Sequence, residues 1–198
     1  MAAFEKIVKS VEALKLHQTP SAVNVDETMT KKDKISHCIS VTDVVCSQGS
    51  KNSSESAKYL AMAMEMFFTL LDDADADIRM VADENLNRMT RSLGEGNIGR
   101  LQVELYKEIK KNGSQRCVRA ALTRFSQLVN HIRPSKCRPY LVNLLPCLEA
   151  LSSRGEEQIH ECMASTFPSI FTVLGHHSNT NEIRTLLKAF MNNIGSTK

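Results

Sequence analysis

The sequence predicts an all-α fold of stacked helix pairs, preceded by a separate amphipathic helix and a flexible linker. Three observations support this prediction. Apolar residues recur at helical spacing along most of the chain, without the sustained alternation that strands show. Helical segments resemble one another at offsets of 39 and 42 residues. Glycines and prolines are few and fall mostly between the apolar runs, as in helices joined by short turns.

The first predicted element is an amphipathic helix over residues 1–17. Its apolar side chains fall within an arc of roughly 120°, and these residues are Phe4, Ile7, Val8, Val11 and Leu14. Lys6 and Lys9 lie outside the arc, whereas Lys15 lies inside it near the end of the helix and must extend its amine towards water. An isolated helix of this length is marginal in water. It therefore needs a partner surface, which the sequence leaves open as a lipid interface, another protein or the following repeats.

Residues 18–29 are interpreted as a linker, because Pro20 disfavours a helix there and few side chains could build a core. The helical array is predicted over residues 30–198 as the start of a longer array. Its first helix runs from about Lys31 to Ser47, and Thr28 to Thr30 offer capping residues. Ser53 or Ser54 is expected to cap the next helix.

An acidic turn separates the next two predicted helices, over 59–71 and 77–93. Asp75 is expected to cap the second of these, and Gly94, Gly96 and Asn97 are expected to mark its end.

The remaining helices are bounded by turn residues. Asn112 and Gly113 end one helix, and Pro134 follows the end of the next. Pro139 is expected in the first turn of the following helix, Pro146 is expected to kink or stop that helix, and Pro168 is expected to limit or bend the one after. The four predicted helices cover 101–109, 117–131, 139–151 and 156–167, and a last one covers 181–194.

Three helices share one core pattern, which predicts HEAT-type repeats forming an α-solenoid. Their equivalent positions are Ile78, Val81, Ala82 and Leu86 in the first, Cys117, Ala120, Ala121 and Phe125 in the second, and Ile159, Cys162, Met163 and Phe167 in the third. These spacings are close to the roughly 40–47 residues of paired-helix solenoid repeats. A generic helical bundle is the alternative. The last helix lacks a partner helix, so we expect an exposed apolar end and self-association of the chain.

Composition indicates an intracellular protein that meets membranes at most peripherally. None of the six cysteines forms a CxxC pair, and most lie within apolar helical patterns, which indicates a reducing compartment. The amino-terminal residues lack the apolar core of a secretory signal. The longest apolar stretch, from Leu60 to Leu71, is too short to span a bilayer and contains Glu65.

The sequence predicts neither an enzyme nor a cofactor. It contains no GxSxG, P-loop or HExxH motif. The acidic cluster between Asp72 and Asp77 is explained by helix capping and turn chemistry. No metal site is expected, because His160 with Cys162, or His176 with His177, does not belong to a four-ligand set with finger-like spacing.

Nucleic acid is not an expected partner. The formal net charge of +3 is too small for this length to indicate nucleic-acid binding. A basic cluster could bind an acidic partner or phosphate, but it is more simply a solvated ridge, and it has few aromatic side chains on which bases could stack. Its residues are Lys107, Lys110, Lys111, Arg116, Arg119 and Arg124.

Particular stretches resemble the huntingtin family. The first helix carries MAAFEKIVKSVEALKLHQ, which is similar to the start of that family. Further similar stretches occur in the same order and at similar intervals: TKKDKISHC (30–38), DIRMVADENLN (77–87), LQVELYKEIKKNG (101–113), RAALTRF (119–125), KCRPYLVNLLPCL (136–148) and NEIRTLLKAF (181–190). The resemblance covers nearly the whole chain apart from the linker. The family's chains are far longer, so the sequence is interpreted as a fragment or an isoform.

The resemblance implies a non-catalytic protein–protein interaction scaffold with HEAT repeats. It implies roles in vesicle transport along microtubules, autophagy, endocytosis and spindle orientation. Its implied partners are transport, cytoskeletal and autophagy factors and the family's stable partner protein. The implied location is the cytoplasm and the surface of vesicles and endomembranes, with shuttling to the nucleus. The first helix would bind membranes reversibly, with its apolar stripe inserted and Lys6, Lys9 and Lys15 facing anionic headgroups.

The sequence departs from vertebrate members after this helix. Gln18 stands alone where those members carry polyglutamine and proline-rich segments, so the properties of those segments do not carry over. Ser10 is the only serine of the helix, and a phosphate there would oppose membrane insertion. Two further function classes stay open. One is a peripheral lipid-sensing protein whose helical domain is only a carrier, and the other is a helical repeat that binds nucleic acid.

Overall fold

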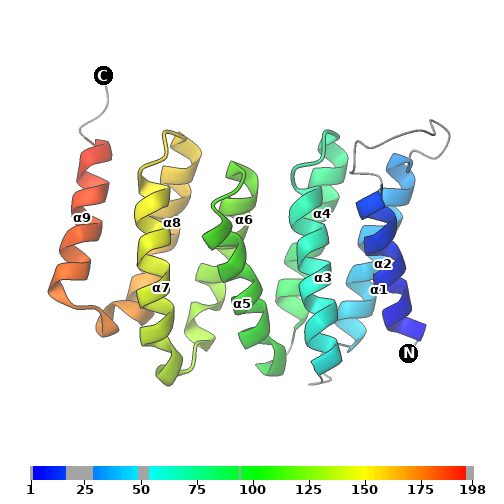
Figure 1. Cartoon of the computed structure of the whole chain (residues 1–198), viewed down its shortest axis with the longest axis horizontal. Helices are drawn as coiled ribbons and strands as arrows, with labels where there is room; N and C mark the ends of the chain where they lie inside the picture. Colours follow the sequence, from blue (N-terminus) through cyan, green and yellow to red (C-terminus); the bar gives the residue numbers. More distant parts are fainter. Residues whose placement is uncertain (1, 17–28, 49–53, 94, 195–198) are drawn as a thin grey trace. The chain divides into compact units, whose positions relative to one another are not determined.

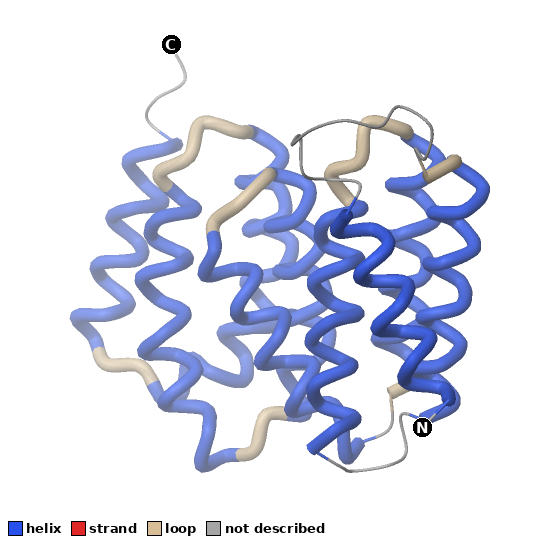
Figure 2. The backbone as a smooth tube through the Cα atoms, turned by 45° about the vertical axis from the view of Figure 1, so that its right-hand side comes forward, coloured by secondary structure: helices blue, strands red, loops and turns tan. Residues whose placement is uncertain are grey.

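The computed structural model describes residues 2–16, 29–48, 54–93 and 95–194. Within these ranges all regular secondary structure is helical (Figures 1 and 2). The linker predicted at 18–29 falls almost entirely outside them, as do Ser53 and Gly94. Contacts divide the chain into two compact units, residues 1–104 and 105–198, and the boundary lies within one helix, α5 (Glu95–Lys111).

The first unit contains two helix pairs and the start of α5. The pairs are α1 (Ala2–Leu16) with α2 (Lys31–Gln48), and α3 (Ser54–Leu70) with α4 (Ala76–Ser92). Helix α1 packs against α2 and α3, and α2 packs against α3 and α4. The first pair therefore stacks on the second, with α1 beside α3 and α2 beside α4 (Figure 1).

The second unit repeats this arrangement. It contains α6 (Gln115–Leu128), α7 (Pro134–Ser152), α8 (Glu157–Leu174) and α9 (Thr180–Ile194), with the short 3-10 helices η1 (Val129–His131) and η2 (Gly175–His177). Helix α6 packs against α8, and α7 packs against both α8 and α9. Alternate helices thus lie side by side, as expected for stacked helix pairs.

The repeat pattern in the sequence corresponds to buried positions. Of the twelve aligned residues only Val81 and Phe167 are half-buried, and the others are buried in α4, α6 and α8. Several contacts between neighbouring pairs join residues 39 positions apart. Arg119 donates to Gln158 over 2.5 Å, and Arg138 donates to the His177 carbonyl over 2.8 Å. The spacing found in the sequence is therefore the register of the stack.

The predicted caps at Thr30 and Asp75 are confirmed. The Thr30 hydroxyl accepts from the Asp33 amide over 3.2 Å, while the Thr30 amide donates to the Asp33 carboxylate over 3.1 Å. This reciprocal pair is the capping-box arrangement, with aspartate in the acidic position. The Asp75 carboxylate accepts from the Asp77 amide over 2.8 Å. Asn112 ends α5 with a φ of 50°, a left-handed conformation that asparagine tolerates.

Several predicted boundaries are wrong. Helix α4 does end at Ser92, but Gly96 and Asn97 lie inside α5 instead of marking a stop. Helix α7 begins at Pro134, so Pro139 lies in its interior instead of in its first turn. The helix continues past Pro146, which therefore does not stop it, and a kink at Pro146 stays a prediction.

Pro168 does not limit α8, which continues to Leu174, and a bend at Pro168 stays a prediction. All three interior prolines are exposed, and so are the residues four positions before them. Each carbonyl that loses its amide partner therefore lies on a solvated part of the helix, where water satisfies it.

Two surface predictions have different outcomes. The predicted basic cluster is not a single solvated ridge, because Arg124 is buried and donates to the Ala120 carbonyl over 3.0 Å. The apolar end predicted at α9 is present, with exposures of 41%, 56% and 69% for Ile183, Leu187 and Met191. Whether this face mediates self-association stays a prediction.

Candidate functional site

Helix α1 is docked on the repeats. Ile7, Val11 and Leu14 are buried, and Val8 is half-buried. These residues recur at the spacing that places side chains on one helix face. Since α1 packs against α2 and α3, its apolar face completes the core of the first helix pair. The sequence left open whether the apolar face of α1 binds a lipid interface, another protein or the repeats. In the structure this face packs against the repeats.

A polar contact accompanies this apolar docking. Ser10 of α1 is buried, and its Oγ lies 2.8 Å from Nδ1 of His37 on α2. A buried hydroxyl without a partner would cost about 1–3 kcal/mol, so the contact favours this placement of α1 over others. Neither residue belonged to the apolar stripe that the sequence indicated. A hydroxyl beside an apolar stripe was the only available signal.

The charged face of α1 points away from the core. Lys6 and Lys9 are exposed, as are Glu5 and Glu12. Phe4 and Lys15 belong to α1, but their side chains lie outside the described part of the structure. Three of the predicted membrane-binding residues therefore lie in the protein core, namely Ile7, Val11 and Leu14, whereas Lys6 and Lys9 lie on the surface. That any of these residues binds a membrane or a partner stays a prediction.

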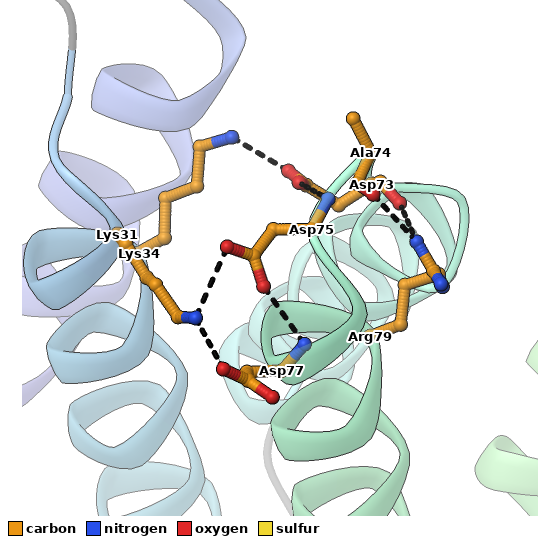
Figure 3. Close-up of polar contacts among 7 residues, drawn as sticks. All are labelled: Lys31, Lys34, Asp73, Ala74, Asp75, Asp77 and Arg79. Carbon is orange, nitrogen blue, oxygen red and sulfur yellow. Dashed lines mark hydrogen bonds and ion pairs between the residues drawn. The ribbon is translucent and has the colours of Figure 1, made fainter.

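Ion pairs join α2 to the turn between α3 and α4. Nζ of Lys34 lies 2.6 Å from the Asp73 carboxylate, and this pair is largely shielded from water. Nζ of Lys31 lies 3.1 Å from the Asp75 carboxylate and also pairs with Asp77 (Figure 3). We call these five residues the α2–turn clamp, because they hold the first helix pair against the second.

The turn itself is ordered by its own polar groups. The Asp73 carboxylate accepts from the Asp75 amide over 2.9 Å. Arg79 donates from Nη1 to the carbonyls of Asp73 and Ala74, over 2.7 Å and 2.8 Å (Figure 3). Capping and turn chemistry, as the sequence predicted, therefore account for part of the acidic cluster. The pairing with lysines was missed, although Lys34 and Asp73 are 39 residues apart, which is the repeat spacing.

The clamp shifts the protonation equilibria of Lys31 and Asp75. Hydrogen bonds to Asp77 and Asp75 raise the pKa of Lys31. The hydrogen bond from Lys31, followed by that from the Asp77 amide, lowers the pKa of Asp75. Both shifts favour the charged forms. Exposed pairs of this kind contribute little individually, and the more buried Lys34–Asp73 pair is expected to contribute more.

The second unit uses arginines for the same purpose. Arg138 of α7 makes a two-pronged contact with Glu182 of α9, over 2.7 Å and 2.8 Å. Arg154 donates to the Asn112 side chain over 2.9 Å and to the Gly113 carbonyl over 2.8 Å, so it ties the α7–α8 turn to the end of α5. These contacts hold helices in register.

Within the described residues, no three or more histidine, cysteine, aspartate or glutamate side chains gather in a way that could hold a metal ion. Among the described helices, none has the length and apolar character needed to cross a membrane. The six cysteines are not joined in disulfides.

Comparisons with known proteins agree with this arrangement. The family model "Huntingtin, N-terminal HEAT 1" matches residues 67–198. Huntingtin of Takifugu rubripes is 48% identical across the whole chain, and the HD protein homolog of Dictyostelium discoideum is 24% identical across 60% of it. The chain spans only 7% and 4% of the lengths of these two relatives.

Proposed function

Because this chain belongs to the huntingtin family and has its all-α HEAT-type solenoid fold, we propose that it is a non-catalytic scaffold for binding other proteins. The observation that carries this proposal is the stacking of helix pairs, in which several contacts join residues 39 positions apart. Stacked pairs leave long helix faces available to partners.

The proposed partners are proteins of vesicle transport, the cytoskeleton and autophagy, together with the family's stable partner protein. The proposed site of action is the cytoplasm and the surface of vesicles, with shuttling to the nucleus. These parts of the proposal derive from membership of the family. The chain is a small part of the length of its relatives, so they are proposals about the longer protein in which these repeats occur.

We further propose that α1 exchanges between the repeats and a membrane surface. The same side chains, Ile7, Val11 and Leu14, form the stripe that a lipid interface would receive and the face buried against α2 and α3. One helix face cannot be buried in both places at once. Membrane binding therefore requires α1 to undock, and docking lowers the apparent affinity for lipid.

The repeats and a membrane compete for α1 because both surfaces bury the same aliphatic side chains. A fully buried aliphatic side chain contributes about 1.5–3 kcal/mol in either environment. The exposed Lys6 and Lys9 add an attraction to anionic lipid of about 1 kcal/mol each near the surface. We therefore expect weak, reversible binding that depends on anionic lipid.

Vesicle co-sedimentation of the full chain tests this proposal. The variant Lys6→Glu/Lys9→Glu changes only exposed residues of α1, so docking should persist while binding to anionic vesicles falls about tenfold or more. The matched control Lys58→Glu/Lys188→Glu reverses the same number of exposed charges on α3 and α9 and should bind like the parent. Equal binding by the two variants would refute a role for α1 at the membrane.

A lipid-sensing protein with the repeats as a mere carrier is the alternative. The burial of α1 in the first helix pair argues against it, because α1 is part of the fold of the repeats. The variants separate the two functions. A scaffold should retain its protein partners when Lys9→Glu has weakened vesicle binding, whereas a lipid sensor should have no partners that depend on the repeats.

A further inference from the structure

A groove of about 440 Å³ lies on the first helix pair, between α1 and α2. Lys6 of α1 forms one side. The α2 residues that line it are Lys32, Ile35, Ser36, Ile39, Ser40, Asp43 and Val44. Their spacing of three and four residues places them along one face of α2 for about three turns.

Helix α2 therefore has a second apolar face. Cys38, Val41 and Val45 are buried in the helix stack. Ile35 and Val44 are half-buried in the groove, and Ile39 remains 44% exposed there. A helix that packed only into the stack would need no such second stripe. The small side chains of Ser36 and Ser40, which separate the aliphatic residues, would let another helix approach closely.

The charges around the groove indicate the chemistry of its occupant. Lys6 and Lys32 approach it from two helices, and both are exposed. Its acidic residue, Asp43, is paired with Arg88 of α4 at 2.7 Å. The groove thus offers an aliphatic floor with a net positive border. This combination is complementary to an amphipathic helix with carboxylates beside its apolar stripe.

A second copy of this chain fits less well. The part of a second copy that could enter the groove is the exposed apolar stripe of α9. Arg184 and Lys188, which are also exposed on α9, lie next to this stripe in the sequence. Basic residues would then face Lys6 and Lys32, which disfavours the complex. A bilayer surface is also a poorer match than a helix for a groove that follows one face of α2.

We propose that the α1–α2 groove binds an acidic amphipathic helix of a partner protein. This inference rests on the proposed scaffold function and names a partner class for one surface. Because Lys6 forms part of the groove, the site is complete only while α1 is docked. An acidic partner helix and a membrane therefore compete for the chain.

The test uses fluorescence anisotropy of the full chain with a labelled helical peptide of about 18 residues, or five turns. The peptide carries leucines along one face and glutamates beside them, and a second peptide replaces each glutamate with lysine. We expect saturable binding of the glutamate peptide and at least about tenfold weaker binding of the lysine peptide. Ile39→Asp and Lys32→Glu should each weaken binding of the glutamate peptide by about tenfold or more.

Matched controls test whether the effect belongs to the groove. Met80 is 55% exposed on α4 and Lys58 is exposed on α3, so Met80→Asp and Lys58→Glu make the same changes elsewhere in the first unit. Both should bind the peptide like the parent. All four variants alter exposed residues, and circular dichroism melts verify that each remains folded.

Three results would overturn the inference. The first is equal binding of the two peptides, and the second is unchanged binding by Ile39→Asp. The third is a parent dimer in sedimentation velocity that Ile39→Asp abolishes, since the groove would then hold a second copy. The vesicle experiment tests the membrane proposal separately. Loss of peptide binding by Lys32→Glu with normal vesicle binding supports the groove. Unchanged vesicle binding by Lys6→Glu/Lys9→Glu refutes only the membrane proposal.

Discussion

Ser10 of α1 and His37 of α2 are joined by a contact of 2.8 Å between Oγ and Nδ1, in a region where Ser10 is buried. This contact lies beside Val11 on the docked face of α1. The amino-terminal helix is thus held against the repeats by its buried apolar face and by a specific polar contact. It forms the first helix of the first pair, and a phosphate on Ser10 could not be accommodated in this position.

Loss of a docked side chain should destabilise the protein. Ile7 is fully buried, so Ile7→Ala should lower the free energy of unfolding by about 2–4 kcal/mol. Urea unfolding followed by circular dichroism measures this change. Lys9→Ala, at an exposed position of the same helix, should change it by less than about 0.5 kcal/mol. Equal stability of the two variants would mean that α1 is not docked in solution.

The α2–turn clamp should make the stability of the folded protein depend on pH. The folded-state pKa of Asp75 lies below its unfolded value because of Lys31. The stabilisation that Asp75 contributes to the fold is therefore fully present above its pKa in the unfolded chain, near 4. This stabilisation is lost as the pH falls through the pKa of Asp75 in the folded protein. Asp75→Asn should melt at a lower temperature than the parent at pH 7, and this difference should shrink as the pH approaches about 2.

Glu12→Gln is the matched carboxylate control, because Glu12 is exposed on α1 and lies outside the clamp. It should melt like the parent at pH 7. A constant difference between Asp75→Asn and the parent from pH 7 to about 2 would show that the effect of Asp75 does not depend on its charge.

Thiol reactivity should follow burial. Burial raises the pKa of Cys38 to about 12, so very little of its thiolate exists at pH 8. Cys46 is only half-buried, and iodoacetamide should modify it well before Cys38 in the native protein. Peptide mass spectrometry over a time course measures the order, and labelling in denaturant provides the reference. Modification of Cys38 as fast as Cys46 would contradict the packing of α2.

The interior proline of α8 should limit stability. Pro168 is exposed and removes a helical hydrogen bond, so Pro168→Ala should increase the free energy of unfolding by about 1–2 kcal/mol. Pro134→Ala is the control, because Pro134 begins α7, where proline fits the helix. It should give no comparable gain. A Pro168→Ala variant no more stable than the parent would indicate that α8 is already interrupted there.

The sequence was sufficient to predict the helix ends that depend on interactions between neighbouring residues in the chain. Thr30 and Asp75 cap helices because their side chains reach nearby amides, and Asn112 ends a helix through its own backbone preference. The repeat positions could also be predicted, since the offset between Ile78 and Cys117 repeats a buried pattern. Pro146 and Pro168 do not end their helices, because a solvated helix face tolerates a missing hydrogen bond. Whether a residue is exposed depends on tertiary packing, which the sequence pattern around a proline does not reveal.

The candidate site could be predicted only in part. The apolar stripe through Ile7 and Val11 was evident, but its spacing is the same for a bilayer and a protein groove. The contact between Ser10 and His37, and the pairing of Lys34 with Asp73, depend on how successive layers align. That alignment becomes apparent only when the helices are assembled.

We propose that α1 belongs to the repeats and leaves them for an anionic membrane. Hydrogen exchange of the full chain, measured by mass spectrometry with and without anionic vesicles, reports on both states of α1. Without vesicles, the amides of residues 2–16 should be protected. With vesicles they should stay protected as a membrane-bound helix, while amides of α2 and α3 lose protection as their covering helix departs. Exchange of residues 2–16 at unfolded rates without vesicles would contradict docking, and unchanged protection of α2 and α3 on vesicle binding would contradict the exchange.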